Sequence, residues 1–149
     1  MTRLTQFFQN RVLLCTLTAW VMAQSLKVFL MVRRQHRFDF RWFLGTGGMP
    51  SAHSAGVAAL AAGAGLELGF HAPGFAVALM FALVTMFDAQ GVRRAAGRQA
   101  MILNKMIDEV YVKGQLSEER LMELLGHTPI EVIAGAAIGV LLAILMCRS

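Results

Sequence analysis

Four long apolar stretches constrain the fold of this sequence more than any other feature. They run from about Val12 to Val32, Ala52 to Phe70, Pro73 to Phe87 and Pro129 to Cys147. A helix needs roughly 20 apolar residues to cross the hydrocarbon core of a bilayer. Charged residues make up 15% of the 149 residues, whereas soluble domains carry about 25%. The sequence therefore predicts an all-α integral membrane bundle of about four transmembrane helices, and it argues against a soluble globule, a disordered tail or a freely diffusing nucleic-acid binder.

The order of these stretches places most of the basic residues on one side of the membrane. Only a tight turn at His71 and Ala72 separates the second stretch from the third, so these two are expected to form an antiparallel hairpin. The loops at about 33–51 and 88–128 then share one side, which carries most of the basic residues: Arg33, Arg34, Arg37, Arg41, Arg93, Arg94, Arg98, Lys105, Lys113 and Arg120. By the positive-inside rule we expect this side to be cytoplasmic, and the protein to reside in the cell inner membrane with its active site facing the cytoplasm.

The longer basic loop contains helical patterns of its own. From Ala95 to about Val112 the apolar residues recur with the spacing of an amphipathic helix. Ser117 is a typical N-cap for a second, short helix that Gly126 ends. We expect both to be interfacial helices packed against the bundle or the lipid headgroups. No repeat, low-complexity tract or linker indicates a second domain, so residues 1–149 are expected to form one membrane-embedded unit.

Two basic residues lie in or near the first apolar stretch, where burying a charged side chain in the membrane costs free energy. Lys27 lies inside the first apolar stretch, well before its expected end. A lysine there indicates function by default, although a side chain that reaches the headgroups has a purely structural explanation. Arg34 follows seven residues later, so both cations would project from one helix face, about 10 Å apart along the axis. Two such cations suit a phosphate group.

A glycine-rich string precedes the second apolar stretch. Gly47-Gly48-Met49-Pro50-Ser51-Ala52-His53-Ser54 combines residues that permit close backbone approach, a serine able to cap the helix and a histidine beside that helix end. Backbone amides there could hold an anion. A simple Gly-Pro turn with a capping serine explains the same string equally well.

Two further clusters lie beside the third and fourth stretches. Asp88 precedes Arg93 and Arg94, as either a structural ion pair or an acid that orients a phosphate-binding arginine. His127 lies four residues before Glu131, close enough for the carboxylate to bind one imidazole nitrogen and leave the other nucleophilic. Thr128, Pro129 and Glu131 also form a capping box, which gives Glu131 a structural explanation.

These strings resemble the type 2 phosphatidic acid phosphatase superfamily. Lys27-x(6)-Arg34, Pro50-Ser51-Ala52-His53 and His127-x(3)-Glu131-Val-x(2)-Gly135 occur in the order of its three signature motifs. GGMPSAHSA, DAQGVRRAAGRQA and LLGHTPIEVIAG look like its divergent branch, which is related to acid phosphatases and vanadium-dependent haloperoxidases.

The resemblance implies a role for each matching residue. His127 would attack phosphorus to form a phosphohistidine, and Glu131 would orient it. His53 would protonate the leaving alkoxide and later activate water. Lys27, Arg34 and the backbone around Ser51, with Gly48 in support, would hold the phosphate oxygens. Phosphoryl transfer mainly demands such positioning and charge stabilisation.

The sequence also departs from the superfamily pattern. Gln35 follows Arg34 where proline is common, Ala52 replaces glycine, and Glu131 replaces aspartate. The Ser-Arg pair expected before the nucleophilic histidine is absent, because the residue six before His127 is Leu121. Arg93 or Arg94 is the expected substitute, oriented by Asp88, ahead of Arg120. Four spans are fewer than the superfamily's membrane-bound members usually have, which is compatible with a homodimer.

We therefore expect a lipid-phosphate phosphomonoesterase acting near the headgroup plane, on substrates such as phosphatidylglycerophosphate or phosphatidic acid. Prenyl diphosphate hydrolysis, a catalytically silent scaffold or lipid-binding protein and, more remotely, haloperoxidase activity are the alternatives. No metal site and no cofactor are expected, because the carboxylates and histidines lack metal-ligand spacing. Mg²⁺ dependence through Asp88 with Glu109 or Glu123 stays open. The expected partners are the bilayer, the substrate and, in a homodimer, a second copy of the chain; nucleic acid is not among them.

Overall fold

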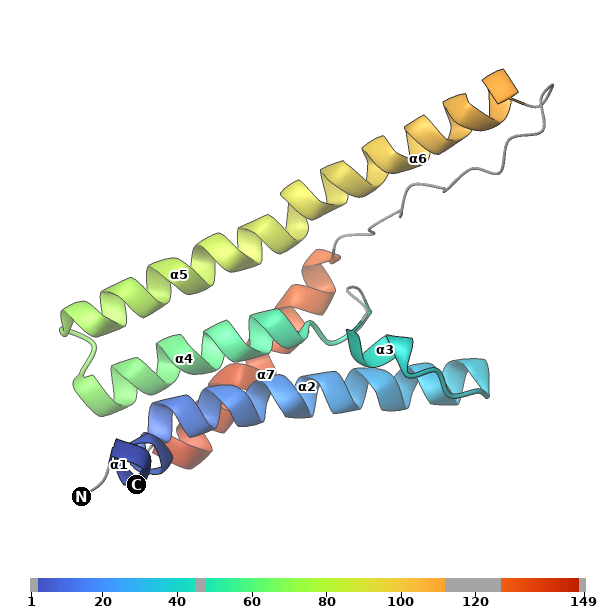
Figure 1. Ribbon diagram of the computed structural model, residues 1–149. Coiled ribbons are helices and arrows are strands. Elements are labelled where there is room, and N and C mark those ends of the chain that lie inside the picture. The colour runs from blue at the N-terminus through green and yellow to red at the C-terminus, as the bar shows by residue number, and fades with distance from the viewer. Residues whose placement is uncertain (1–2, 45–47, 112–126, 148–149) are drawn as a thin grey trace.

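The computed structural model describes residues 3–44, 48–111 and 127–147, which are helical apart from short connections (Figure 1). The helices are α1 (Arg3–Gln9), α2 (Arg11–Gln35), α3 (Arg41–Leu44), α4 (Ala52–Leu68), α5 (Pro73–Gln90), α6 (Val92–Tyr111) and α7 (Pro129–Cys147). The short helix expected after Ser117 lies outside the described residues.

Three helical stretches of the described chain are long and apolar enough to cross a membrane. They are Arg11–Gln35, Pro73–Ile107 and Pro129–Cys147. The remaining expected span corresponds to α4, which has 17 residues and a length of about 25 Å at 1.5 Å per residue. The predicted helical membrane bundle is confirmed, with three clear candidate spans and a shorter fourth helix at its centre.

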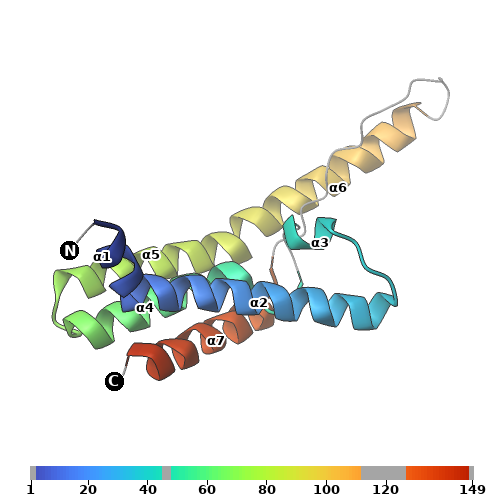
Figure 2. The same ribbon diagram turned by 60° about the horizontal axis from the view of Figure 1, so that its bottom comes forward.

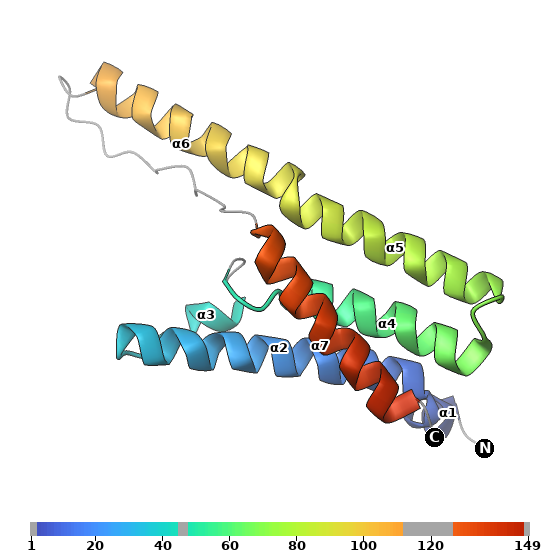
Figure 3. The ribbon, with the colours of Figure 1, turned by 180° about the vertical axis from the view of Figure 1, so that it is seen from behind.

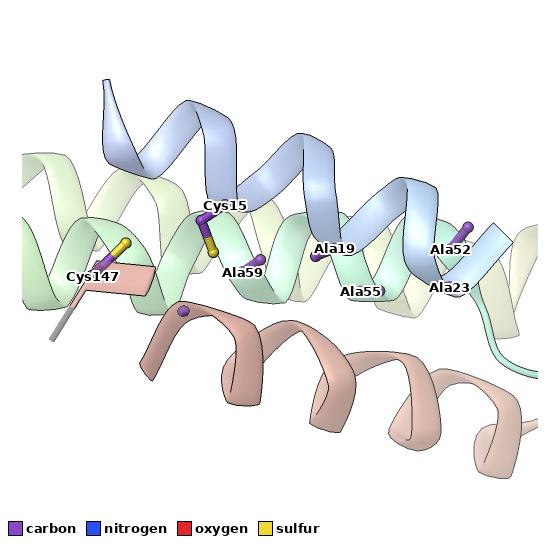
Figure 4. Close-up of a cluster of buried hydrophobic side chains, with 8 residues drawn as sticks. Cys15, Ala19, Ala23, Ala52, Ala55, Ala59 and Cys147 are labelled. Carbon is purple, nitrogen blue, oxygen red and sulfur yellow. The ribbon is translucent and has the colours of Figure 1, made fainter. Parts of the chain in front are cut away.

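Helix α4 packs against α2, α5 and α7 because its surface is built from alanine and glycine. One core cluster joins α2, α4 and α7 through eight small side chains, all but Ala143 labelled in Figure 4: Cys15, Ala19, Ala23, Ala52, Ala55, Ala59, Ala143 and Cys147. On α7, a Cβ added at Gly135 would overlap the backbone oxygen of Ser51, and one at Gly139 would overlap that of Ala55. Gly135 and Gly139 lie one helical turn apart in the string GAAIG, a small-xxx-small spacing that predicts close packing of membrane helices. The structure shows this close packing.

The two ends of the bundle differ in what they bring together. Both termini and the turn between α4 and α5 lie at one end, whereas the start of α4, the end of α5 and the start of α7 lie toward the other (Figures 1 and 3). The motif-bearing ends of α4, α5 and α7 thus lie toward the same end of the bundle, and their place on one side of the membrane stays a prediction. That end also receives α3, whose carbonyl groups at Trp42 and Phe43 accept hydrogen bonds from the buried Gln24 amide.

The position of helix α6 is set by its continuity with α5. It is helical as predicted, but it continues the line of α5 and extends away from the bundle (Figure 2). Among the described helices it packs only on α5. The cause lies at Gly91, where the hydrogen-bond ladder is not broken: Gly91 N–H donates to Phe87 at 2.8 Å, and Ala95 N–H donates to Gly91 at 2.9 Å. Of the two expected positions, packing against the bundle is limited in the described helices to the contact with α5, and packing against the lipid headgroups stays a prediction.

Candidate functional site

The strongest chemical feature is the pair formed by His127 and Glu131 at the start of α7. The imidazole Nδ1 and Glu131 Oε2 are 3.0 Å apart, and His127 is only 3% exposed. An ionised carboxylate can only accept, so Nδ1–H is the donor, and in the neutral imidazole Nε2 then carries the lone pair. The backbone N–H of His127 donates to Ala89 at the end of α5. The histidine is thus fixed from two sides.

Glu131 is also part of a capping box, as the sequence indicates. Its Oε2 accepts a hydrogen bond from Thr128 N–H at 3.0 Å, and Glu131 N–H is 3.4 Å from Thr128 Oγ1. The two interpretations of Glu131, as an orienting group and as a cap, are therefore compatible. A single carboxylate oxygen contacts both the imidazole and the helix N-terminus.

Ser51 lies at the contact between α4 and α7. It is fully buried, its N–H donates to the Glu131 carbonyl at 3.0 Å, and its Oγ accepts from Ser54 N–H and Oγ–H. Ser51 is therefore the N-cap of α4, one of the two roles that the sequence leaves open. Its N–H is directed at α7, so a phosphate held nearby would need other donors.

Lys27, Gly48 and Arg34 gather beside Glu131. A cavity of about 420 Å³ is lined by Leu30, Met31, Arg34, Gln35, Gly48, Met49 and Glu131. Lys27 is 4% exposed and is attracted electrostatically by Glu131. Gly48 has φ +89°, and a Cβ there would lie 3.4 Å from Lys27 Cδ, so this glycine supplies both a left-handed turn and close approach to the lysine stem. The cavity is thus lined by residues from three sequence motifs, among them Arg34, Gly48 and Glu131.

His53 lies on a different surface from this cavity. It is exposed in the first turn of α4 and lines a second cavity of about 450 Å³ with Thr16, Leu17, Trp20, Gly56, Val57, Leu60 and Phe81. The two sites are nevertheless near each other, because His53 is two residues from Ser51, which is hydrogen-bonded to Glu131. The acid–base role that the resemblance implies for His53 stays a prediction.

The cluster of Asp88, Arg93 and Arg94 is described only in part. Asp88 is half-buried in the last turn of α5, next to Ala89, whose carbonyl binds His127. Arg93 and Arg94 lie in the first turn of α6, but the structure does not describe their side chains, and Arg120 is outside the described residues. Among the residues that are described, no three His, Cys, Asp or Glu side chains are grouped to hold a metal ion.

Sequence reasoning did not assign a role to Gln24. Its Nε2 is 2.6 Å from the Phe43 carbonyl and so fixes α3 onto α2. The available signal is an amide three residues before Lys27 in an otherwise apolar stretch, which places both on one helix face. The apolar groove beside His53 was missed as well, because it depends on how three helices are rotated.

Comparison with known proteins identifies the family of the chain. A model described as the divergent PAP2 family matches residues 8–142. An uncharacterised membrane protein of Bacillus subtilis (strain 168), YuiD, is 40% identical over 152 residues, which cover 95% of this chain and 96% of the relative. No solved structure matches the chain. The chain thus carries the family pattern across nearly its whole length, and it belongs to the divergent PAP2 family of membrane proteins.

Proposed function

We propose that this protein is a membrane lipid-phosphate phosphatase that hydrolyses a phosphomonoester through a phosphohistidine intermediate. The observation that carries the proposal is the 3.0 Å hydrogen bond between His127 Nδ1 and Glu131 Oε2, within a chain of the divergent PAP2 family. This bond fixes the tautomer in which Nε2 carries a lone pair. A fixed, unprotonated imidazole nitrogen is what a nucleophilic histidine requires.

The reaction would proceed in two displacements. Nε2 attacks phosphorus, a P–N bond forms, and the P–O bond to the lipid alcohol breaks. The departing alkoxide takes a proton, for which His53 is the proposed donor. Water then attacks the phosphohistidine, loses a proton to His53 and releases inorganic phosphate together with the free imidazole. Glu131 stabilises the positive charge that develops on the imidazole ring during the first step.

The phosphate oxygens would lie in the cavity beside Glu131. Lys27 and Arg34 supply positive charge, and Gly48 lets the backbone approach. We propose Arg93 or Arg94, oriented by Asp88, as the further clamp that replaces the missing Ser-Arg pair. Because charge stabilisation dominates phosphoryl transfer, the reaction itself needs no metal ion in this scheme.

The position of the site favours a substrate with its phosphate at the headgroup plane. The motif-bearing ends lie on the side that carries most basic loop residues, proposed as the cytoplasmic side of the inner membrane. Biosynthetic lipid intermediates such as phosphatidylglycerophosphate and phosphatidic acid present their phosphates there. A prenyl diphosphate suits an outward-facing site, and a homodimer is compatible with the small number of spans.

Phosphate release by detergent-purified protein tests the proposal. The panel comprises phosphatidylglycerophosphate, phosphatidic acid and a prenyl diphosphate, each with EDTA or Mg²⁺ and with His127→Ala as the control. We expect release that depends on His127 and survives EDTA. Activity that vanishes with EDTA and returns with Mg²⁺ would refute the metal-free mechanism. If no lipid is hydrolysed and vanadate does not bind, the protein is the silent scaffold favoured by the absent Ser-Arg pair.

Two substitutions at Glu131 separate the effect of its charge from that of its capping hydrogen bond. Glu131→Gln keeps an oxygen for Thr128 N–H but removes the charge, so we expect turnover to fall by about a hundredfold or more with the fold retained. Glu131→Ala removes the cap as well and should also destabilise α7 by about 1 kcal/mol. Turnover and thermal unfolding in detergent are the measurements. Full activity in Glu131→Gln, with unfolding of Glu131→Ala, would leave Glu131 only its capping role.

A further inference from the structure

The apolar groove beside His53 has no role in the chemistry described above. Its floor is one stripe of α4, formed by His53, Gly56, Val57 and Leu60 at the spacing of a single helix face. Thr16, Leu17 and Trp20 of α2 form one wall, and Phe81 of α5 contributes the other. At about 450 Å³ it is as large as the cavity beside Glu131. It therefore needs an explanation of its own.

The lining of this groove suits hydrocarbon. Apart from His53, only Thr16 and Trp20 among the lining residues have a polar side-chain atom. Thr16 Oγ1 donates to the Val12 carbonyl within α2 at 2.8 Å. Leu17, Trp20 and Phe81 are 46%, 43% and 55% exposed. They lie in segments expected to cross the membrane, so the groove opens toward lipid chains rather than toward water.

Gly56 keeps this groove open for a reason unrelated to helix packing. A Cβ there would make ordinary contact with Trp20, with its nearest atom at 3.6 Å. Gly135 and Gly139 differ, because a Cβ at either position would overlap backbone atoms of α4. The α2–α4 contact thus tolerates a side chain at Gly56, and the missing side chain leaves space over the floor of the groove.

The groove has a defined polar end. His53 occupies the first turn of α4, and Leu60 lies seven residues deeper, about 10 Å along the helix axis. Ser51, two residues before His53, is hydrogen-bonded to Glu131 at the phosphate cavity. A lipid whose phosphate occupies that cavity would therefore meet His53 first and then a hydrocarbon-lined channel running toward the membrane interior.

We propose that this groove is the binding site for the proximal part of one acyl chain of a lipid phosphate, with the bond to the leaving oxygen near His53. This inference rests on the proposed function and deepens it. Attack from the His127 side expels the alcohol that carries the lipid chains. A proton donor at the mouth of the chain groove is then on the leaving-group side, which accounts for His53 lying apart from Lys27, Arg34 and Glu131.

Photo-crosslinking tests occupancy without relying on catalysis. The full-length protein in nanodiscs is irradiated with phosphatidic acid that carries a diazirine in one acyl chain, and labelled residues are mapped by mass spectrometry. We expect labels on the groove segments of α2 and α4, competed by unlabelled phosphatidic acid but not by phosphatidylcholine. Equal labelling by a diacylglycerol with the same diazirine chain, or competition by a prenyl phosphate alone, would overturn the proposal.

A matched pair of valine substitutions tests the site itself. Val57→Phe fills the groove, whereas Val77→Phe adds the same bulk on α5 at a position that is 71% exposed. Val57→Phe should lower groove labelling at least fivefold. It should also lower kcat/KM for dioleoyl phosphatidic acid by about tenfold, as expected for roughly two lost methylene contacts, and less for the dihexanoyl lipid. Val77→Phe should change neither quantity.

The outcomes of these experiments test the acyl-chain groove and the proposed phosphatase reaction separately. Groove labelling specific to phosphatidic acid without phosphate release would support the groove and refute the proposed function. Phosphate release with no chain-length effect in Val57→Phe would support the function and refute the groove. If Val57→Phe does not fold, Leu60→Phe replaces it. The labelling of the wild-type protein still shows whether an acyl chain occupies the groove.

Discussion

His127→Ala is expected to abolish phosphate release while leaving the bundle folded. The imidazole supplies the bond-forming nitrogen, and the alternative attack by water would have no activated nucleophile. By analogy with other nucleophile deletions, turnover should fall by about a thousandfold or more. The fold should persist because the contact of α7 with α4 is formed by Ser51 with the Glu131 backbone and by Gly135 and Gly139, not by the imidazole.

The direct measurement for this prediction is the trapped intermediate. Brief incubation with a ³²P-labelled lipid phosphate and quenching in alkali should leave label on the wild-type protein that is lost in acid, as phosphohistidine is. His127→Ala should carry no label. His71→Ala is the matched control, because His71 is an exposed histidine in the turn at the opposite end of the bundle. Full activity in His127→Ala, or label retained by it, would refute the mechanism.

Local spacing predicted the parts of the site that lie on one helix. The four-residue separation of His127 and Glu131 predicts a side-chain contact, and the structure places them 3.0 Å apart. The hairpin between α4 and α5 predicts which helix ends share a side, because each span reverses the chain direction. Small-residue spacing in α7 predicts the close approach of two helices. Each of these inferences uses only geometry fixed by the helix or by the order of spans.

Features that depend on the rotation of one helix against another could not be predicted. The proximity of Lys27 to Glu131 requires α2 to turn that face toward α7. The separation of His53 from the phosphate cavity arises because α4 presents one stripe to α2 and α5 and another to α7. The direction of α6 depends on whether the helix breaks at Gly91, and amphipathic spacing beyond that residue carries no information about it.

The glycines of α7 should be the positions where the smallest change most damages the fold. In Gly135→Ala and Gly139→Ala the new methyl group meets backbone oxygen and nitrogen atoms of α4, which cannot rotate away as a side chain could. The two helices must separate, and overpacking of this kind costs about 1–3 kcal/mol. Replacing glycine by alanine in a helix returns at most about 1 kcal/mol of intrinsic propensity. The net effect should be destabilising.

Gly63→Ala provides the control that isolates backbone overlap from helix propensity. It changes another buried glycine, but its Cβ would meet only side-chain atoms of Val12 and Cys147 at 3.4 and 3.5 Å, apart from the Val12 Cα at 3.7 Å. Thermal unfolding in detergent should therefore show lower midpoints for Gly135→Ala and Gly139→Ala and an unchanged or higher midpoint for Gly63→Ala. Equal midpoints for all three would mean that α4 and α7 do not approach this closely in the membrane. In that case Ser51 would not be held against Glu131, and the link between the phosphate cavity and the His53 groove would be lost with it.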